Sequence, residues 1–129
     1  MEKWYAKARL AFPEVISGEN QSMYNHNPTM YGLWFDLLRL TQEAHEKNDV
    51  NLLKRVYPLA EWFFYSTEED YSNCVVVSFY EHLIDCDKTL EGISNWVSKD
   101  IIEKVMPLWK LRSKHHPKQY AKLEMLMDK

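Results

Sequence analysis

The fold class is decided by nineteen residues, Tyr65–Leu83, which read YSTEEDYSNCVVVSFYEHL. Ser66 and Glu69 have the spacing of a capping box, in which each side chain accepts a hydrogen bond from the backbone N–H of the other. They predict a helix over residues 67–85. The run Cys74–Tyr80 also suits a buried strand by propensity alone, but the capping signal and the helical repeat that follows favour a helix. Because this helix is apolar on nearly all sides, we expect it at the centre of a bundle, covered by other helices.

Helical periodicity extends to both sides of this segment. Apolar residues recur at intervals of three and four from Pro28 to Lys47 and again from Asp49 to Asp85, with charged residues between them. Asn27-Pro28 has the pattern of an N-cap followed by proline at the first helical position. The other predicted helices are residues 2–11, one that follows residues 48–49 and carries an apolar stripe to Phe64, residues 87–97, one that begins at 98 or 99, and residues 117–127.

Two of these helices contain a proline, Pro58 and Pro107. We expect a kink or a break at each, because proline lacks an N–H and clashes with the preceding turn. The segments around them are similar, since Leu52–Leu59 aligns without a gap with Ile101–Leu108. Repeated helix pairs would stack as solenoid-like helical hairpins, and an irregular orthogonal bundle is the alternative. Either way the prediction is all-α: one domain over residues 1–129, a compact multi-helix bundle of about five to seven helices.

The apolar runs, the first residues and the cysteines of the chain indicate where in the cell the protein is found. The chain has no run of about 18 apolar residues, and its first residues lack the apolar core of a signal peptide. Cys74 and Cys86 are twelve positions apart, which along one helix corresponds to about 18 Å. That separation is too large for a disulfide. We therefore expect a cytoplasmic protein with reduced thiols and no contact with a membrane.

Charge is distributed unevenly along the chain. Residues 1–98 contain eight Lys and Arg against fifteen Asp and Glu, whereas residues 99–129 contain eight against four. An acidic body of this kind suits a basic partner, because complementary fields raise the association rate; solvated surface is the alternative. The basic tail (Lys110, Arg112, Lys114, His115, His116, Lys118 and Lys122, with Trp109 and Tyr120) is the one candidate for binding nucleic acid. A pI of about 5.9 is too acidic for typical phosphate binding, so we expect no nucleic-acid partner.

No constellation of residues predicts chemistry. The five histidines form no HExxH pair, the two cysteines form no CxxC pair, and no spacing brings together the three or four ligands of a metal site. The carboxylates Glu68, Glu69 and Asp70 stand at a predicted helix start, where the helix dipole favours negative charge. We therefore expect no enzymatic activity, no metal and no cofactor.

The aromatic run Trp62-Phe63-Phe64-Tyr65 points to binding instead. Four consecutive helical residues cover about 300° of the circumference, so the core stripe that holds Phe63 and Phe64 leaves Trp62 and Tyr65 for a second layer, solvent or a partner. Tyr and Trp are enriched in binding hot spots. Acidic residues fall close by in the sequence. The predicted partner-binding face is Glu61, Trp62, Tyr65, Glu68, Glu69 and Asp70.

Two further acidic features accompany this face. Glu81 falls on an apolar helix, so it either pairs with a basic or hydroxyl group inside the fold or marks where the helix reaches the surface. Asp85, Asp87 and Glu91 form a second acidic strip, which is the alternative binding face.

Residues 31–84 also resemble a known family. The similarity is carried by the aromatic-rich helix that begins near Tyr31, the charged turn Lys47–Leu53, the stretch Leu59–Phe63 around a glutamate, and the ending Phe79–Leu83. The segment is similar to small all-helical bacterial proteins encoded beside polymorphic or contact-dependent growth inhibition toxins, some of which act as immunity proteins.

This resemblance implies an immunity protein that binds one cognate toxin domain in the cytoplasm and blocks its active site or substrate groove. The toxin would be a nuclease, and such toxins tend to be basic, which agrees in sign with the acidic first 98 residues. The residues leave two alternatives open: a nucleic-acid-binding regulator that uses the basic tail, and a homodimeric helical adaptor.

Overall fold

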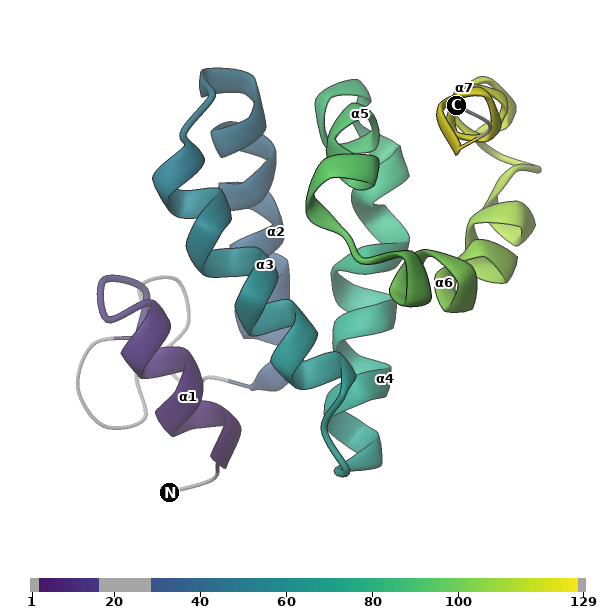
Figure 1. The fold of residues 1–129 in the computed structure, drawn as a ribbon. Helices are drawn as coiled ribbons and strands as arrows, with labels where there is room; N and C mark the ends of the chain where they lie inside the picture. Colours follow the sequence, from purple (N-terminus) through teal and green to yellow (C-terminus); the bar gives the residue numbers. More distant parts are fainter. Residues whose placement is uncertain (1–2, 17–28, 128–129) are drawn as a thin grey trace.

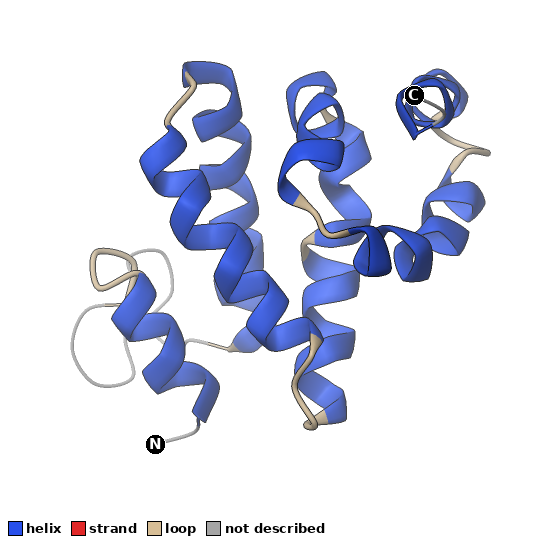
Figure 2. Ribbon diagram, in the orientation of Figure 1, coloured by secondary structure: helices blue, strands red, loops and turns tan. Residues whose placement is uncertain are grey.

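The computed structural model describes residues 3–16 and 29–127, without the side chain of Glu69. Within these ranges the chain forms α-helices and one 3₁₀ helix and no strand (Figures 1 and 2), so the all-α prediction is confirmed. The elements are α1 (Lys3–Ala11), α2 (Met30–Lys47), α3 (Val50–Phe64), α4 (Glu69–Ser78), the 3₁₀ helix η1 (Tyr80–Asp85), α5 (Asp87–Trp96), α6 (Lys99–Arg112) and α7 (Pro117–Met127).

The helices form a packed bundle (Figure 1), whose main contacts join consecutive helices and also helices that are not consecutive in the sequence. α2 and α3 pack together and against α4, while α5 packs on η1 and α2. α6 and α7 contact each other and reach the rest mainly through η1 and α5. α1 lies against α3 at the opposite side of the molecule from α7. The prediction of a multi-helix bundle is confirmed, whereas contacts such as that of α2 with α5 are not those of pairs that stack only on their neighbours.

Of the kink or break predicted at Pro58 and Pro107, the break does not occur, because α3 and α6 each run through their proline. Both prolines are exposed, and so are Lys54 and Glu103, whose carbonyls lose a hydrogen-bond partner four residues before each proline. On a solvent-facing side of a helix, water can replace the missing bond. The buried stripes on the other side hold each helix together.

The predicted helix over residues 67–85 is also wrong in its extent. α4 ends at Ser78, Phe79 adopts φ −127° and ψ −69°, and the chain continues as η1. The change of helix type at Phe79 directs the adjacent rings of Phe79 and Tyr80 into the core, where they meet edge to face at 5.4 Å. α4 is not covered on all sides, since Val77 is 40% exposed.

The observed N-caps of α4 and α2 can be compared with the predicted ones. Ser66 is not the N-cap of α4: Glu68 occupies that position without a side-chain cap, and the Ser66 hydroxyl accepts a hydrogen bond from the Glu68 backbone N–H at 3.1 Å. The other side chain of the predicted capping box, that of Glu69, lies outside the described part of the structure. α2 is capped by Thr29, whose hydroxyl accepts from the Gly32 N–H at 2.9 Å. Asn27 and Pro28, which the sequence pattern favoured for that role, lie outside the described residues.

A buried polar pair joins α2 to α3. His45 Nε2 lies 2.8 Å from the Tyr57 hydroxyl, and Trp96 of α5 stacks on the Tyr57 ring at 5.5 Å. Gly92 lets α5 approach this pair closely, because a Cβ there would stand 2.5 Å from His45 Cε1. Burial lowers the pKa of His45, since removal from water disfavours the charged imidazolium.

Arg55 fastens α1 and the turn after it to α3. Its Nε and Nη2 donate to the Ala11 carbonyl at 3.0 and 2.7 Å, and Nη2 also contacts Glu14 Oε1 at 2.5 Å. The guanidinium stands 4.3 Å from the centre of the Phe12 ring. At the other end of α1, the backbone N–H of Trp4 donates to the Tyr71 hydroxyl at 3.3 Å. Both ends of α1 are therefore tied to the bundle.

We expect Arg55→Ala to loosen α1. The substitution removes charge-assisted hydrogen bonds to Ala11 and Glu14, so we expect a loss of about 1–2 kcal/mol in the free energy of unfolding. Amide hydrogen exchange in α1 should increase more than in α5. Lys54→Ala, at the exposed neighbouring position, is the matched control and should leave both quantities unchanged. Equal behaviour of the two variants would contradict this role for Arg55.

The buried His45 predicts a pH dependence of stability. Its pKa in the folded chain is below the ordinary value of 6.5, so between these two values the unfolded chain binds the extra proton and folding opposes it. The contribution of His45 to stability is therefore complete above the ordinary pKa and is lost as the pH falls below it. Chemical denaturation from pH 7.5 to 5 should show a steeper decline for the wild type than for His45→Gln. Parallel curves would contradict the prediction.

Candidate functional site

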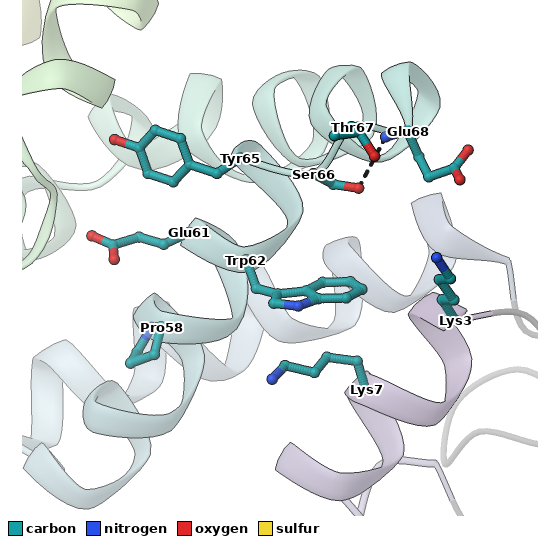
Figure 3. Close-up of a pocket in the computed structure, with 9 residues that line it drawn as sticks. All are labelled: Lys3, Lys7, Pro58, Glu61, Trp62, Tyr65, Ser66, Thr67 and Glu68. Atoms are coloured by element: carbon teal, nitrogen blue, oxygen red, sulfur yellow. Dashed lines mark hydrogen bonds between the residues drawn. The ribbon is translucent and has the colours of Figure 1, made fainter.

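An open groove of about 510 Å³ lies between α1 and the C-terminal end of α3, where the chain turns into α4 (Figure 3). α3 supplies one wall, α1 the other, and the turn at residues 65–68 closes one side. Its lining residues are Lys3, Lys7, Pro58, Glu61, Trp62, Tyr65, Ser66, Thr67 and Glu68.

The groove brings together four residues of the predicted binding face: Glu61, Trp62, Tyr65 and Glu68. Asp70 is exposed at the start of α4 but is not among the lining residues. The side chain of Glu69 lies outside the described part of the structure. The residues predicted from the sequence therefore form most of one wall of the groove.

The Trp62 ring packs on other aromatic rings and also borders the open groove. Its ring is half-buried and contacts the rings of Phe63 at 5.4 Å and Tyr71 at 6.0 Å. Tyr65 is 55% exposed, and its hydroxyl lies 3.5 Å from the Ser98 hydroxyl. The two aromatics thus differ: packing holds the Trp62 ring, whereas Tyr65 stands at the rim.

The second wall carries positive charge, which the sequence analysis missed. Lys3 and Lys7 are exposed and lie one turn apart on α1, whose other side buries Trp4 and Ala8. Lys7 Nζ stands 5.5 Å from the centre of the Trp62 ring, and its side chain extends along the indole in Figure 3. The predicted binding residues therefore include the acidic and aromatic side of this groove and leave out its basic side. The spacing of these lysines was visible in the sequence, but nothing local paired α1 with residues more than fifty positions later.

The charged groups of the groove are not neutralised within it. No salt bridge joins Lys3, Lys7 or Glu61 to any other side chain in residues 3–16 and 29–127. The same holds for Glu68 and Asp70 among the described side chains. Both signs of charge therefore remain available around an aromatic floor.

The carboxylates of the alternative acidic strip, in contrast, pair with residues of the basic tail. Arg112 Nη2 donates to Asp85 Oδ1 at 2.5 Å, and His82 Nδ1 lies 2.9 Å from Asp85 Oδ2. Lys122 Nζ lies 2.8 Å from Glu91 Oε1 and 4.0 Å from Asp87 Oδ1. The Lys122 hydrogen bond lowers the pKa of Glu91.

Glu81 pairs with a basic group, as one of the two predictions for it required. Arg112 Nη1 lies 3.6 Å from Glu81 Oε1, and both side chains are about three-quarters buried, at 23% and 22% exposed. Arg112 thus joins η1 to α6 through Glu81 and Asp85.

The two cysteines and the possible metal ligands are the remaining groups considered in the sequence. Cys74 and Cys86 are both free, as their spacing predicted, and burial raises the pKa of Cys74 to about 11. No three His, Cys, Asp or Glu side chains in the described ranges converge as metal ligands. None of the helices formed by residues 3–16 and 29–127 has the length and hydropathy needed to cross a membrane.

Fold and site together define an all-α protein with an open, aromatic-floored groove of mixed charge. A family model matches residues 5–122, and the chain therefore belongs to that family, described as a domain of unknown function (DUF7674). The match includes α3, the turn after it and most of α1. No curated protein and no solved structure shows a significant match to the chain.

Proposed function

We propose that this protein binds a partner protein through the groove beside Trp62. We further propose that the partner is a cognate toxin domain, a nuclease, which the protein neutralises in the cytoplasm by binding alone. The toxin and its chemistry rest on the resemblance of residues 31–84 to immunity proteins. The use of the groove rests on its own residues.

The observation that carries the proposal is the state of Trp62. Its ring is held by Phe63 and Tyr71 on one side and borders an open groove on the other. An aromatic side chain already fixed before binding loses little conformational entropy when a partner covers it. Residues of this type, surrounded by polar groups, are the usual energetic centres of protein interfaces.

Electrostatics supports a partner with basic groups. Glu61, Glu68 and Asp70 form no salt bridge with described side chains, so their charges act on an approaching molecule. Such charges raise the association rate with a basic surface. Lys3 and Lys7 in the same groove favour a partner that also carries an acidic or polar group.

The basic tail gives less support to nucleic-acid binding. Arg112 and Lys122 are engaged in salt bridges with Asp85, Glu81, Asp87 and Glu91. Phosphate binding would have to compete with these contacts, because the strength of phosphate binding depends on the number of cations free to neutralise phosphates.

The function is tested by co-expression with the product of the adjacent gene, which the proposal expects to contain a toxic nuclease domain. We expect cells that produce both proteins to grow, and the purified pair to form a complex of equal stoichiometry in isothermal titration calorimetry. Growth arrest despite normal levels of folded protein would contradict the proposal. Self-association without complex formation would favour the homodimeric adaptor.

The interface is tested by binding kinetics at several ionic strengths. We expect Glu68→Lys combined with Asp70→Lys to slow association and to flatten its salt dependence. The melting temperature should fall slightly, because positive charge at the start of α4 opposes the helix dipole. Trp62→Ala should raise the dissociation rate by roughly tenfold or more, as expected of a hot spot. It should also lower the melting temperature, because the ring packs on Phe63 and Tyr71.

A matched charge control lies on α2. Glu43 and Glu46 are exposed near the end of that helix, at the opposite end of the α2–α3 pair from the groove (Figure 1). Glu43→Lys combined with Glu46→Lys changes the net charge by the same amount. If this control slows association as much as the groove variant does, the effect belongs to net charge and the proposed interface is wrong.

A further inference from the structure

We propose that the groove receives an aspartate or glutamate side chain of its partner, whose carboxylate accepts a hydrogen bond from the Trp62 indole N–H and pairs with the Lys7 ammonium. The carboxylate lies at the edge of the Trp62 ring, while the rest of the partner segment crosses the open groove. This inference rests on the proposed function, because it assumes that a partner protein occupies the groove.

The first observation is that the Trp62 indole N–H has no acceptor. It forms no hydrogen bond with any residue in 3–16 and 29–127. Trp34 Nε1 also lacks a partner but is enclosed in the core, whereas Trp62 is half-buried and borders the groove. An indole nitrogen is a donor only, so a guest at this position has to offer an acceptor, such as a carboxylate oxygen.

The second observation is the arrangement of charge around the same ring. Lys7 Nζ stands 5.5 Å from the ring centre, within the range of about 6 Å in which the electron-rich face of an aromatic ring attracts a cation. The edge of the ring has the opposite, positive character, and in tryptophan this edge includes the N–H. A cation of the chain itself thus already uses the face of the Trp62 ring, and the edge is left for an anion.

The third observation is that two unpaired ammonium groups stand on a fixed wall. Lys3 and Lys7 are exposed, line the groove and form no salt bridge with a described side chain. Arg55 holds one end of α1 and the backbone N–H of Trp4 holds the other. In Figure 3 Lys7 extends along the indole, whereas Lys3 extends toward the turn at residues 66–68. Lys7 therefore makes the direct contact with the carboxylate, and Lys3 adds an attraction from farther away.

The two carboxylates of the lining set an upper limit on the charge of the guest. In Figure 3 the side chains of Glu61 and Glu68 both extend away from the Trp62 ring, so neither occupies the position proposed for the guest. Over the whole groove, however, their charges balance those of the two lysines. A doubly charged phosphate meets more repulsion from them than a singly charged carboxylate does, because the Coulomb energy grows with the charge.

The shape of the groove favours an acidic side chain over the free end of a chain. The groove has a volume of about 510 Å³ and lies open between α1 and α3, so a segment of a partner can enter it and continue on both sides. The residues next to the acidic one then pack against Pro58 and Tyr65, which line the same groove. A partner segment with one acidic residue between apolar ones fits this arrangement.

The test uses small probes and the full chain without a toxin. N-acetyl-glutamate α-amide is titrated into ¹⁵N-labelled protein at constant ionic strength, and the Trp62 indole N–H signal is followed by NMR after assignment with Trp62→Phe. We expect this signal to move to higher proton frequency, because the N–H gains a charged acceptor. N-acetyl-glutamine α-amide has the same shape without the charge and should bind more weakly, and N-acetyl-lysine α-amide should leave the signal unchanged.

Variants separate the role of Lys7 from that of net charge. Lys7→Gln should weaken binding of the glutamate probe by about two- to five-fold, the size expected of an exposed ion pair, whereas Lys7→Arg should retain binding. Lys47→Gln is the matched control, because it removes the same charge from an exposed position at the far end of α2, and it should leave binding unchanged. The indole signals of the other four tryptophans report whether each variant is folded.

The inference is overturned if the glutamine or the lysine probe shifts the Trp62 signal as strongly as the glutamate probe, or if Lys7→Gln and Lys47→Gln weaken binding equally. Tighter binding of inorganic phosphate, or of N-acetyl-alanine as a model of a free chain end, also overturns it, because the site would then prefer a different anion. These outcomes leave the proposed function to its own co-expression test. Conversely, selective binding of the glutamate probe without any toxin complex would support this inference and reject the proposed function.

Discussion

The packing around Phe79 is the contact on which the rest of this structure depends. Its ring lies 5.1 Å from that of Trp34 on α2 and 5.8 Å from that of Tyr57 on α3. Trp34 in turn meets Phe63 of α3 edge to face at 5.1 Å. One side chain at the junction of α4 and η1 thus fixes three helices against each other. Aromatic pairs in these geometries stabilise a core beyond the area they bury.

The groove follows from this core. Phe63 is completely buried in the aromatic cluster. Trp62 precedes it on α3 and points in a different direction around the helix, so the Trp62 side chain lies at the edge of the core. There its ring covers Tyr71 and Phe63 and still borders solvent. α1 then adds a second wall, because Arg55 and Tyr71 hold both of its ends. Trp62 and the α1 wall are therefore both positioned by contacts within the fold.

Sequence reasoning located the helices well because their signals are local. Apolar periodicity and capping residues such as Asp49 and Ser98 act within a few positions, and both cap the helices that follow them. The helix end at Ser78 was missed because it is set by tertiary packing: Phe79 and Tyr80 both face the core only if the helix type changes between them. The breaks at Pro58 and Pro107 were predicted because the exposure of the preceding turn was unknown.

Only one of the two walls of the groove was predicted, because the other wall depends on tertiary contacts. The α3 wall is continuous in sequence, whereas Lys3 and Lys7 come from a helix that only the folded chain brings near.

The uneven charge of the sequence has two different outcomes in the fold. In the C-terminal half, the basic tail and the acidic strip meet, and Arg112 and Lys122 neutralise the carboxylates of η1 and α5. These pairs are between one-fifth and three-quarters exposed on each side, so they add little stability in water, but they leave that face with little net field. At the groove the opposite holds, since α1 contributes two lysines that stay near the carboxylates without pairing with them. Charges left unpaired beside a fixed aromatic ring cost the free protein little and remain available to a partner, which makes the groove the stronger candidate for recognition than the more acidic strip.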